Sequence, residues 1–345
     1  MAAVTVCASG DFFDDDEAPI PSPMSCALLW REYAARPREA APPVSSALWN
    51  NARLLAYHSE FVTLRTPVMG EAHRQLRSTL LVNNRHRGTA RRGLIVSGPP
   101  GAGKSTTLME LGRSFERSER AKRAALRDYL PVVFAAIPPT CTPKGLVIEF
   151  ARFLGIPVHN RLTESTITDA VCRVMVERRT RLVFIDDVHL LNTRTRPGAD
   201  SSDQVKALAE RVPATFVLAG VNVENSPLLT GPRGAQLAAR FKILRTPPLL
   251  NGTAEQKSVW RKLLGDMELA LRLRNHRPGT LVRHADLIHM RTGGVMTSLS
   301  ALIREAAICA VDDGSYAITR KHLSGVVLDI QATNTERARR RPGDS

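Results

Sequence analysis

The segment at residues 98–105 constrains this chain more than any other, and it reads Gly-Pro-Pro-Gly-Ala-Gly-Lys-Ser. It matches the phosphate-binding pattern G-x-x-x-x-G-K-[ST] in full. The apolar run Leu94–Val96 precedes it, and a helix with apolar residues on one side begins at Lys104. A strand, a glycine-rich loop and a helix in this order predict a nucleotide-binding P-loop.

The chemistry of such a loop explains its spacing. Glycines let backbone N–H groups approach phosphates closely, and the helix N-terminus adds positive potential. We expect Lys104 to reach the β- and γ-phosphates of ATP and Ser105 to give its hydroxyl to Mg²⁺. The alternative is a glycine-rich turn with an idle lysine. The residues predicted to bind the cofactors ATP and Mg²⁺ are Gly98, Pro99, Pro100, Gly101, Ala102, Gly103, Lys104, Ser105 and Thr106.

Two carboxylates, Asp186 and Asp187, end the apolar run Leu182–Ile185. The first is placed to hold the hydration shell of Mg²⁺, and the second to polarise the attacking water. For Asp186 the alternative is an ordinary loop acid. His189 follows closely and would sense nucleotide or touch DNA, although a structural histidine is the favoured interpretation.

Apolar runs alternate with amphipathic helices from residue 61 to 248, and such alternation is typical of a parallel sheet covered on both faces. Thr142-Pro143 is typical of a helix start and Gly155 of a helix end. Strands are expected at Leu94–Val96, Val132–Ile137, Leu182–Ile185, Thr215–Ala219 and Phe241–Leu244.

Residues 249–330 carry only helical patterns. A capping box of Thr253 and Gln256 opens the first helix, and further helices are expected near 280–291, 297–312 and 320–329. The expected fold class is therefore α/β, with a P-loop NTPase core at 61–248, in which helices sandwich a parallel sheet, and a C-terminal helical domain at 249–330.

The two ends of the chain differ from this core. Residues 1–24 are acidic, then rich in Pro and Ser, and are expected to be disordered. Helices are expected at Ala27–Ala35 and Ser45–Ser59, so residues 1–60 form an N-terminal extension that we hypothesise to bind a partner. Residues 331–345, which contain Arg337 and Arg339–Arg341, are expected to form a basic tail.

The charge and the cysteine content indicate the kind of partner and the cellular compartment. The 48 Lys and Arg against 33 Asp and Glu give a net charge of +15, which favours a nucleic-acid partner or reflects an arginine-rich surface. Five cysteines without a CxxC pair fit a reducing cytosol. An apolar run of about 18 residues is missing, and Asp14–Glu17 lie near the start, so we expect a cytoplasmic protein without a membrane span or secretory signal.

The chain resembles AAA+ ATPases of the initiator and transposition branch, above all the TniB/TnsC family of transposition ATPases, with IstB-like transposition helpers and helicase loaders related to it. The resemblance covers roughly residues 60–330. It rests on Thr66-Pro67, Arg91–Leu94, the P-loop, Val132–Pro139, Phe184–Leu191, Thr215–Gly220, Gln236–Phe241 with Pro247–Leu249, and Thr292–Gly294 before an Ala-rich helix. It implies an AAA+ core followed by a helical lid.

The resemblance also implies roles for matching residues. Arg240 corresponds to an arginine finger that reaches the γ-phosphate in a neighbouring subunit, and a salt bridge beside a strand is its alternative. Asn222 corresponds to a polar sensor residue. Arg240 and Asn222 complete, with Lys104 and Asp187, the predicted catalytic set. Thr142 and Lys144 correspond to a loop lining a DNA channel, although a helix cap with a solvated lysine explains them equally well.

Two departures from the family pattern stand out. The second carboxylate is usually Glu, and here it is the shorter Asp187, so turnover is expected to be slow. Many AAA+ lids carry an Arg early in the helix after the glycine pair, where this chain has Met296 and Thr297.

The resemblance implies an ATP-dependent accessory protein of DNA transposition. Subunits would assemble in ATP as a homo-oligomer on double-stranded DNA and engage a DDE-type transposase, with DNA-stimulated hydrolysis taking the assembly apart. A replication initiator or helicase loader is the first alternative. A nucleotide-switched signalling or defence ATPase that ignores DNA is the second.

Overall fold

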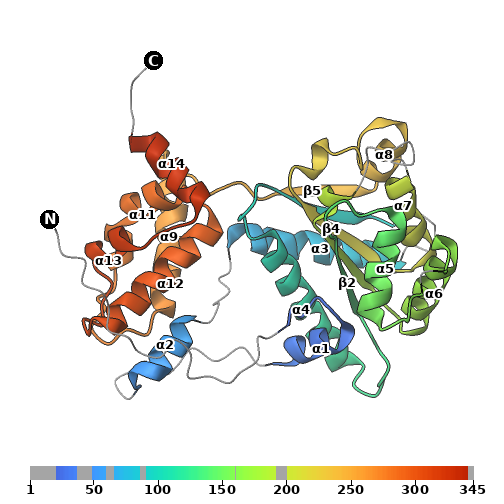
Figure 1. The fold of residues 1–345 in the computed structure, drawn as a ribbon, viewed down its shortest axis with the longest axis horizontal. Helices are drawn as coiled ribbons and strands as arrows, with labels where there is room; N and C mark the ends of the chain where they lie inside the picture. The colour runs from blue at the N-terminus through green and yellow to red at the C-terminus, as the bar shows by residue number, and fades with distance from the viewer. Residues whose placement is uncertain are drawn as a thin grey trace.

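The computed structural model describes residues 21–36, 49–59, 66–85, 91–159, 161–191 and 200–340. The expectations for residues 1–20, for 45–48 and for Arg341 lie outside these ranges. Two lobes follow one another along the chain, an α/β core and a helical lid (Figure 1). None of the described helices is long and apolar enough to cross a bilayer.

The core is built on a five-stranded sheet in which every strand pair is parallel. All five predicted strands are confirmed with small shifts at their ends. They are β1 (Gly93–Ser97), β2 (Val132–Ala136), β3 (Leu182–Asp186), β4 (Thr215–Gly220) and β5 (Phe241–Arg245), in the order β2-β3-β4-β1-β5. Because all strands run the same way, their carboxyl ends meet at one edge of the sheet.

The register brings apolar side chains together across strands. Phe134 of β2 pairs with Phe184 of β3, and their rings stack at 4.6 Å. Strands β1, β3 and β4 are buried along their whole length, whereas β5 at the edge is partly exposed. This burial on both faces explains why the sequence shows continuous apolar runs instead of alternation.

Two helix layers cover the sheet (Figure 1). One layer contains α3 (Pro67–Arg85) and α4 (Lys104–Lys122). The other contains α5 (Pro143–Leu154), α6 (Glu164–Glu177), α7 (Asp200–Arg211) and α8 (Gly231–Ala238). The predicted ends of α5 are confirmed, since Thr142 Oγ1 accepts from Gly145 N at 3.1 Å and Gly155 ends the helix with a φ of 71°.

The lid has a hydrophobic core of its own, centred on Trp260, Leu264 and Leu302. Its first helix opens with the predicted capping box of Thr253 and Gln256. The helices are α9 (Ala254–Ala270), α10 (Thr280–Arg283), α11 (Ala285–Thr292), α12 (Met296–Asp312), α13 (Arg320–Gly325) and α14 (Ile330–Arg340).

The end of the lid differs from the expectation. The helix predicted over 320–329 stops at Gly325, and the stretch predicted as a basic tail begins with α14. Helix α14 packs against α11, and its Ala332 is only 2% exposed. Burial of this small apolar face draws the first part of the basic stretch into the lid.

The N-terminal extension contacts both lobes (Figure 1). Helix α1 (Ala27–Ala35) places Trp30 in the core, where its ring lies 4.5 Å from that of Phe134. Helix α2 (Asn51–Ser59) places Leu54 in the lid core, and the Tyr57 hydroxyl donates to Ala270 O at 2.8 Å. The apolar sides of α1 and α2 that carry Trp30 and Leu54 are therefore buried within this chain, and partner binding by residues 1–60 stays a prediction.

The substitution Trp30→Ala is expected to lower the free energy of unfolding of the core by about 3–5 kcal/mol, because it empties a fully buried site. Leu28→Ala on the same helix is the matched control, since Leu28 is 64% exposed and its loss should stay within about 0.5 kcal/mol. Urea unfolding followed by circular dichroism measures both. Equal losses in the two variants would contradict the packing of α1 on the core.

Candidate nucleotide-binding site

The predicted site residues gather at the carboxyl edge of the sheet. The loop after β1 leads into α4, and Asp186 ends β3. The loop is tied to neighbouring strands, because Gly98 N donates to Gly220 O at 3.3 Å and Thr246 N donates to Ser97 O at 2.8 Å. The sheet thus fixes the position of the loop from both sides.

The loop has the geometry of a phosphate cradle. Gly101 and Gly103 have φ angles of 71° and 79°, in the left-handed region that favours glycine. Lys104 is 7% exposed, and its Nζ donates to Gly98 O at 3.0 Å and to Pro99 O at 2.8 Å. The first N–H groups of α4 lack helical acceptors, as in any helix, and are free for an anion. The residues therefore fit the triphosphate that the motif predicts.

Asp186 lies buried beside Lys104, with 2% of its surface exposed. It accepts a hydrogen bond from Asp187 N at 2.9 Å and one from the hydroxyl of Ser105. Burial raises the pKa of Asp186, and burial lowers the pKa of Lys104 against the attraction of the two aspartates. The pairing of Ser105 with Asp186 fits a magnesium ion, which prefers oxygen ligands and retains several of its waters.

Asp187 and His189 face the same cavity of about 390 Å³ as the P-loop. Asp187 has a φ of 55°, and its side chain is 45% exposed. His189 Nδ1 accepts from Val221 N at 3.3 Å and lies 3.9 Å from Asp187 Oδ1. Because Nδ1 is an acceptor here, the neutral ring carries its proton on Nε2. His189 therefore has both a structural bond and a place in the cavity.

Asn222 stands apart from this cavity. It is exposed, with a φ of 46°, and precedes the short helix η4 (Val223–Asn225). Its neighbour Val221 is among the described residues that line the phosphate cavity, and Asn222 is not. A polar link that the sequence did not indicate lies next to it: Ser97 Oγ donates to Glu224, whose other oxygen accepts from Arg245 Nε at 3.2 Å.

The lid touches the P-loop directly. Both the N–H and the hydroxyl of Thr297 donate to Gly101 O, at 3.1 and 3.0 Å. Gly294 has a φ of 73°, and a Cβ there would lie 1.9 Å from Leu249 O, so only glycine fits against the linker between the lobes. A close backbone approach thus explains Gly294, and Gly293 ends α11 with a φ of 63°.

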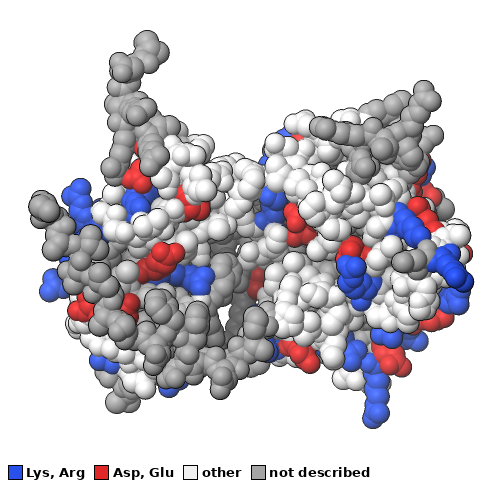
Figure 2. Space-filling model, in the orientation of Figure 1, with Lys and Arg blue, Asp and Glu red and all other residues white. Residues whose placement is uncertain are grey.

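A second cavity of about 260 Å³ lies between core and lid. Figure 2 shows the molecule hollowed between its two lobes. Gly103, Thr106 and Thr297 line both cavities, so the two adjoin. The second is mainly apolar and fits the base and sugar of a nucleotide whose phosphates occupy the first. It is lined mainly by Thr66, Val68, Met69, Thr107, Pro247, Leu249, Met296 and Ala301.

Arg304 is a lining residue that the sequence analysis missed. It lies two turns beyond Met296, and its guanidinium donates to His58 O at 3.3 Å and to Ser59 O, at the end of α2. The signal was present, because Arg304 is the one basic residue of α12. The lid therefore brings an arginine to this pocket from a later position than the family pattern suggests.

Arg240 lies at the amino ends of the strands, on the side of the sheet opposite to the P-loop. Its carbonyl oxygen accepts a hydrogen bond from Gly93 N at the start of β1. The P-loop follows the other end of β1, four residue steps or about 13 Å away. Its guanidinium pairs with Glu210 at 2.9 Å. The structure therefore brings Lys104, Ser105 and Asp186 together but keeps Arg240 away from its own P-loop.

Thr142 and Lys144 lie at the start of α5, where Thr142 caps the helix. The preceding residue, Cys141, donates from its N–H to Leu190 O at 3.2 Å. This loop therefore follows β2 at the same edge as the acidic end of β3. Capping of α5 explains the side chain of Thr142. The role of Lys144 stays a prediction.

The fold and the site define a P-loop ATPase of the AAA+ class. The solved structures that it resembles include Cdc6p from Pyrobaculum aerophilum, with 18% identity over 77% of this chain and 68% of that one and a TM-score of 0.53. ORC2 from Aeropyrum pernix gives 17% identity, 82% and 72% coverage and a TM-score of 0.57. ORC1 from the same organism, solved in complex with DNA, gives 18% identity over 84% of this chain and 70% of that one, with a TM-score of 0.54.

The family model described as "Bacterial TniB protein" matches residues 55–251, more than half of the chain. The protein belongs to the TniB family, as the sequence resemblance indicated. A comparison with curated proteins finds no match.

Asp186→Asn is expected to stabilise the nucleotide-free protein at neutral pH. Burial raises the pKa of Asp186, so the folded state holds this proton more tightly than the unfolded chain. The protonated form of Asp186 therefore stabilises the folded state. This contribution is fully present when the pH is below the ordinary pKa of a carboxyl group, and it is lost as the pH rises through the raised pKa of Asp186. Thermal unfolding should show the gain at neutral pH shrinking as the pH falls.

The half-exposed Asp187 supplies the control. Asp187→Asn should change the unfolding midpoint little at either pH, because its side chain remains in contact with solvent. A loss of stability in Asp186→Asn at neutral pH would show that its hydrogen bonds outweigh its burial.

Proposed function

We propose that this protein is an ATP-dependent accessory factor of DNA transposition. Binding of ATP assembles its subunits on double-stranded DNA, the assembly engages a DDE-type transposase, and hydrolysis takes it apart. One observation carries the proposal: a TniB-family chain holds a complete P-loop and acidic strand end at one edge of its sheet and an arginine at the other.

The chemistry at the carboxyl edge follows from the contacts of the P-loop. Lys104, which donates to two loop carbonyls here, would bind the β- and γ-phosphates, while Ser105 and Asp186 would hold Mg²⁺. When bound, this ion neutralises charge on the phosphate oxygens. Asp187 accepts a proton from the attacking water, and the Nε2–H of His189 donates toward the same cavity.

Assembly of subunits explains the separation of Arg240 from the P-loop of its own chain. A guanidinium at the far edge reaches a γ-phosphate only when that phosphate belongs to a neighbouring subunit. The ion pair with Glu210 holds Arg240 in the isolated chain and has to open when the neighbour docks. Hydrolysis therefore depends on assembly.

DNA binding is supported by the net charge of +15 and by the family. Thr142 and Lys144 are the proposed phosphate contacts at the start of α5. On the face drawn in Figure 2, Lys and Arg side chains alternate with Asp and Glu over the described surface. Contacts of this scattered kind position a protein on the DNA backbone without reading sequence.

The decisive test measures ATP hydrolysis with and without nonspecific duplex DNA, together with particle size in ATP. The wild type should form a large DNA-bound species and hydrolyse faster on DNA. Asp187→Asn should slow hydrolysis by about two to four orders of magnitude while the protein still binds ATP and assembles. Lys104→Ala should lose nucleotide binding and should not assemble by itself. ATP turnover that ignores DNA, without assembly, would contradict the transposition proposal.

A mixing experiment tests the role of Arg240. Arg240→Ala and Lys104→Ala subunits should each be inactive alone, because one lacks the finger and the other lacks the phosphate ligand. Their mixture should regain hydrolysis, since a Lys104→Ala subunit still offers Arg240 to its neighbour. Glu210→Gln is the control that removes the ion pair and leaves the arginine intact. A mixture no more active than its parts would contradict a finger acting between subunits.

A further inference from the structure

A groove of about 720 Å³ lies between α3 and α4, away from the nucleotide site. Leu76 and Leu111, which are 4% and 1% exposed, lie at its base together with the partly buried Leu80 and Phe115. Leu81, on the same helix as Leu80, is 58% exposed beside them. The groove therefore offers an apolar floor to whatever enters it.

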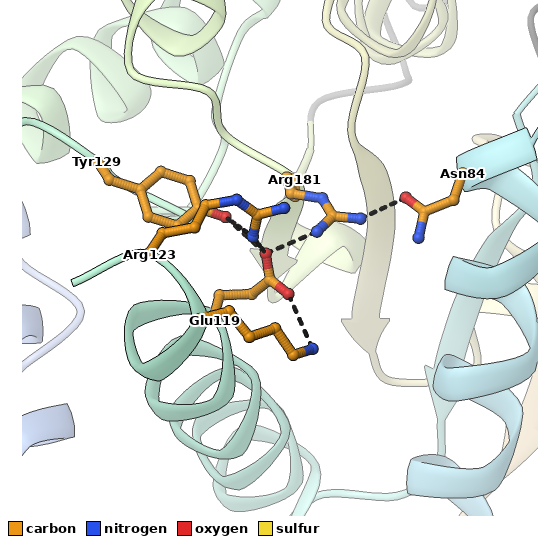
Figure 3. A network of polar contacts seen from close by, with 6 residues as sticks. Asn84, Glu119, Arg123, Tyr129 and Arg181 are labelled. Carbon is orange, nitrogen blue, oxygen red and sulfur yellow. Dashed lines mark hydrogen bonds and ion pairs between the residues drawn. The ribbon is translucent and has the colours of Figure 1, made fainter. Parts of the chain in front are cut away.

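Basic side chains surround this floor. Glu119 is the one carboxylate among the described lining residues, and it contacts Lys122 at 3.4 Å, Arg123, and Arg181 at 2.6 Å. Arg181 immediately precedes β3, and its guanidinium donates to the side chain of Asn84 of α3 (Figure 3). Five lining cations stand against the lining Glu119, and Arg74 also pairs with Glu71 beside the groove, so an excess of three positive charges remains. The cations that line the groove are Arg74, Arg77, Lys122, Arg123 and Arg181.

The same chain contains a segment of complementary chemistry. Residues 11–17 read Asp-Phe-Phe-Asp-Asp-Asp-Glu, with five carboxylates and two aromatic rings. Residues 1–20 contain no Lys or Arg. We propose that residues 11–17 dock in this groove of their own chain, with Phe12 or Phe13 on the apolar floor and the carboxylates against the arginines and Lys122.

The connection is long enough for this contact. Helix α1 packs on α4, with Trp30 against Gly112 and donating to Glu116 at 3.4 Å. The groove uses an adjoining face of α4 that carries Leu111 and Phe115. Phe13 lies eight residue steps before Pro21, where the described chain begins, and eight steps span up to about 27 Å when extended. That exceeds the width of a helix, about 10–12 Å with side chains.

The floor favours this occupant over a nucleic-acid backbone. Binding of phosphates requires only cations, so the apolar floor of the groove would add nothing to it. Burial of an aromatic ring on Leu76 and Leu111 adds a stabilising hydrophobic contact to the ion pairs. Docking would also occupy basic groups that otherwise attract DNA without regard to sequence. The proposal does not depend on ATP hydrolysis, so it stands or falls separately from the proposed function.

Site-specific photocrosslinking in the full-length chain tests the contact. The photoreactive residue p-benzoylphenylalanine replaces Phe13, and mass spectrometry maps its products after irradiation. We expect crosslinks to residues 73–85 or 111–123 of the same chain. Arg77→Glu with Lys122→Glu should lower their yield about tenfold, because two attractions become two repulsions. Adding Asp15→Lys and Asp16→Lys to that protein should restore the yield.

The matched control is Arg261→Glu with Lys262→Glu on the exposed face of α9, which changes the net charge equally and should leave the yield unchanged. Thermal unfolding verifies that both double variants remain folded. Mixing of ¹⁵N-labelled and unlabelled chains identifies crosslinks between subunits, and their predominance would overturn docking within one chain. An unchanged yield in the groove variant would overturn the proposal, as would loss of DNA affinity in that variant without any crosslink.

Discussion

The burial of Asp186 beside Lys104 is the interaction on which the rest of the site depends. Each side chain is almost completely buried, and burial shifts both pKa values toward the neutral forms. Proximity of opposite charges works against that shift and keeps the pair ready for a charged ligand. The sheet enforces the proximity, because parallel strands deliver the P-loop and the end of β3 to the same edge.

The core and the lid are joined beside the nucleotide pocket, and the N-terminal extension bonds to a lid residue that lines this pocket. Thr297 bonds to Gly101 of the P-loop, and Leu249 of the linker bonds to Gly294 of the lid. Arg304 lies in the pocket and bonds to the end of α2. Occupation of the pocket by a nucleotide would therefore bear on the lid and on the N-terminal extension together.

The sequence predicted the sheet and the P-loop well because their signals are local. A buried parallel strand is a short apolar run, and Thr142, Gly155 and Thr253 mark helix ends through bonds within a few residues. The extension was predicted less well. Trp30 and Leu54 look like free apolar faces in the sequence, and only the packing of distant segments showed that each completes a different core.

By itself the sequence determined the strands, the P-loop residues, the acidic strand end and the helical lid, because each is encoded in residues adjacent along the chain. Tertiary structure alone decided that Arg304 reaches the pocket, that Arg240 faces away from its own P-loop, and that α14 joins the lid. These outcomes depend on contacts between segments far apart in sequence. The packing of two separate cores sets such contacts, and it leaves no periodic pattern in the sequence.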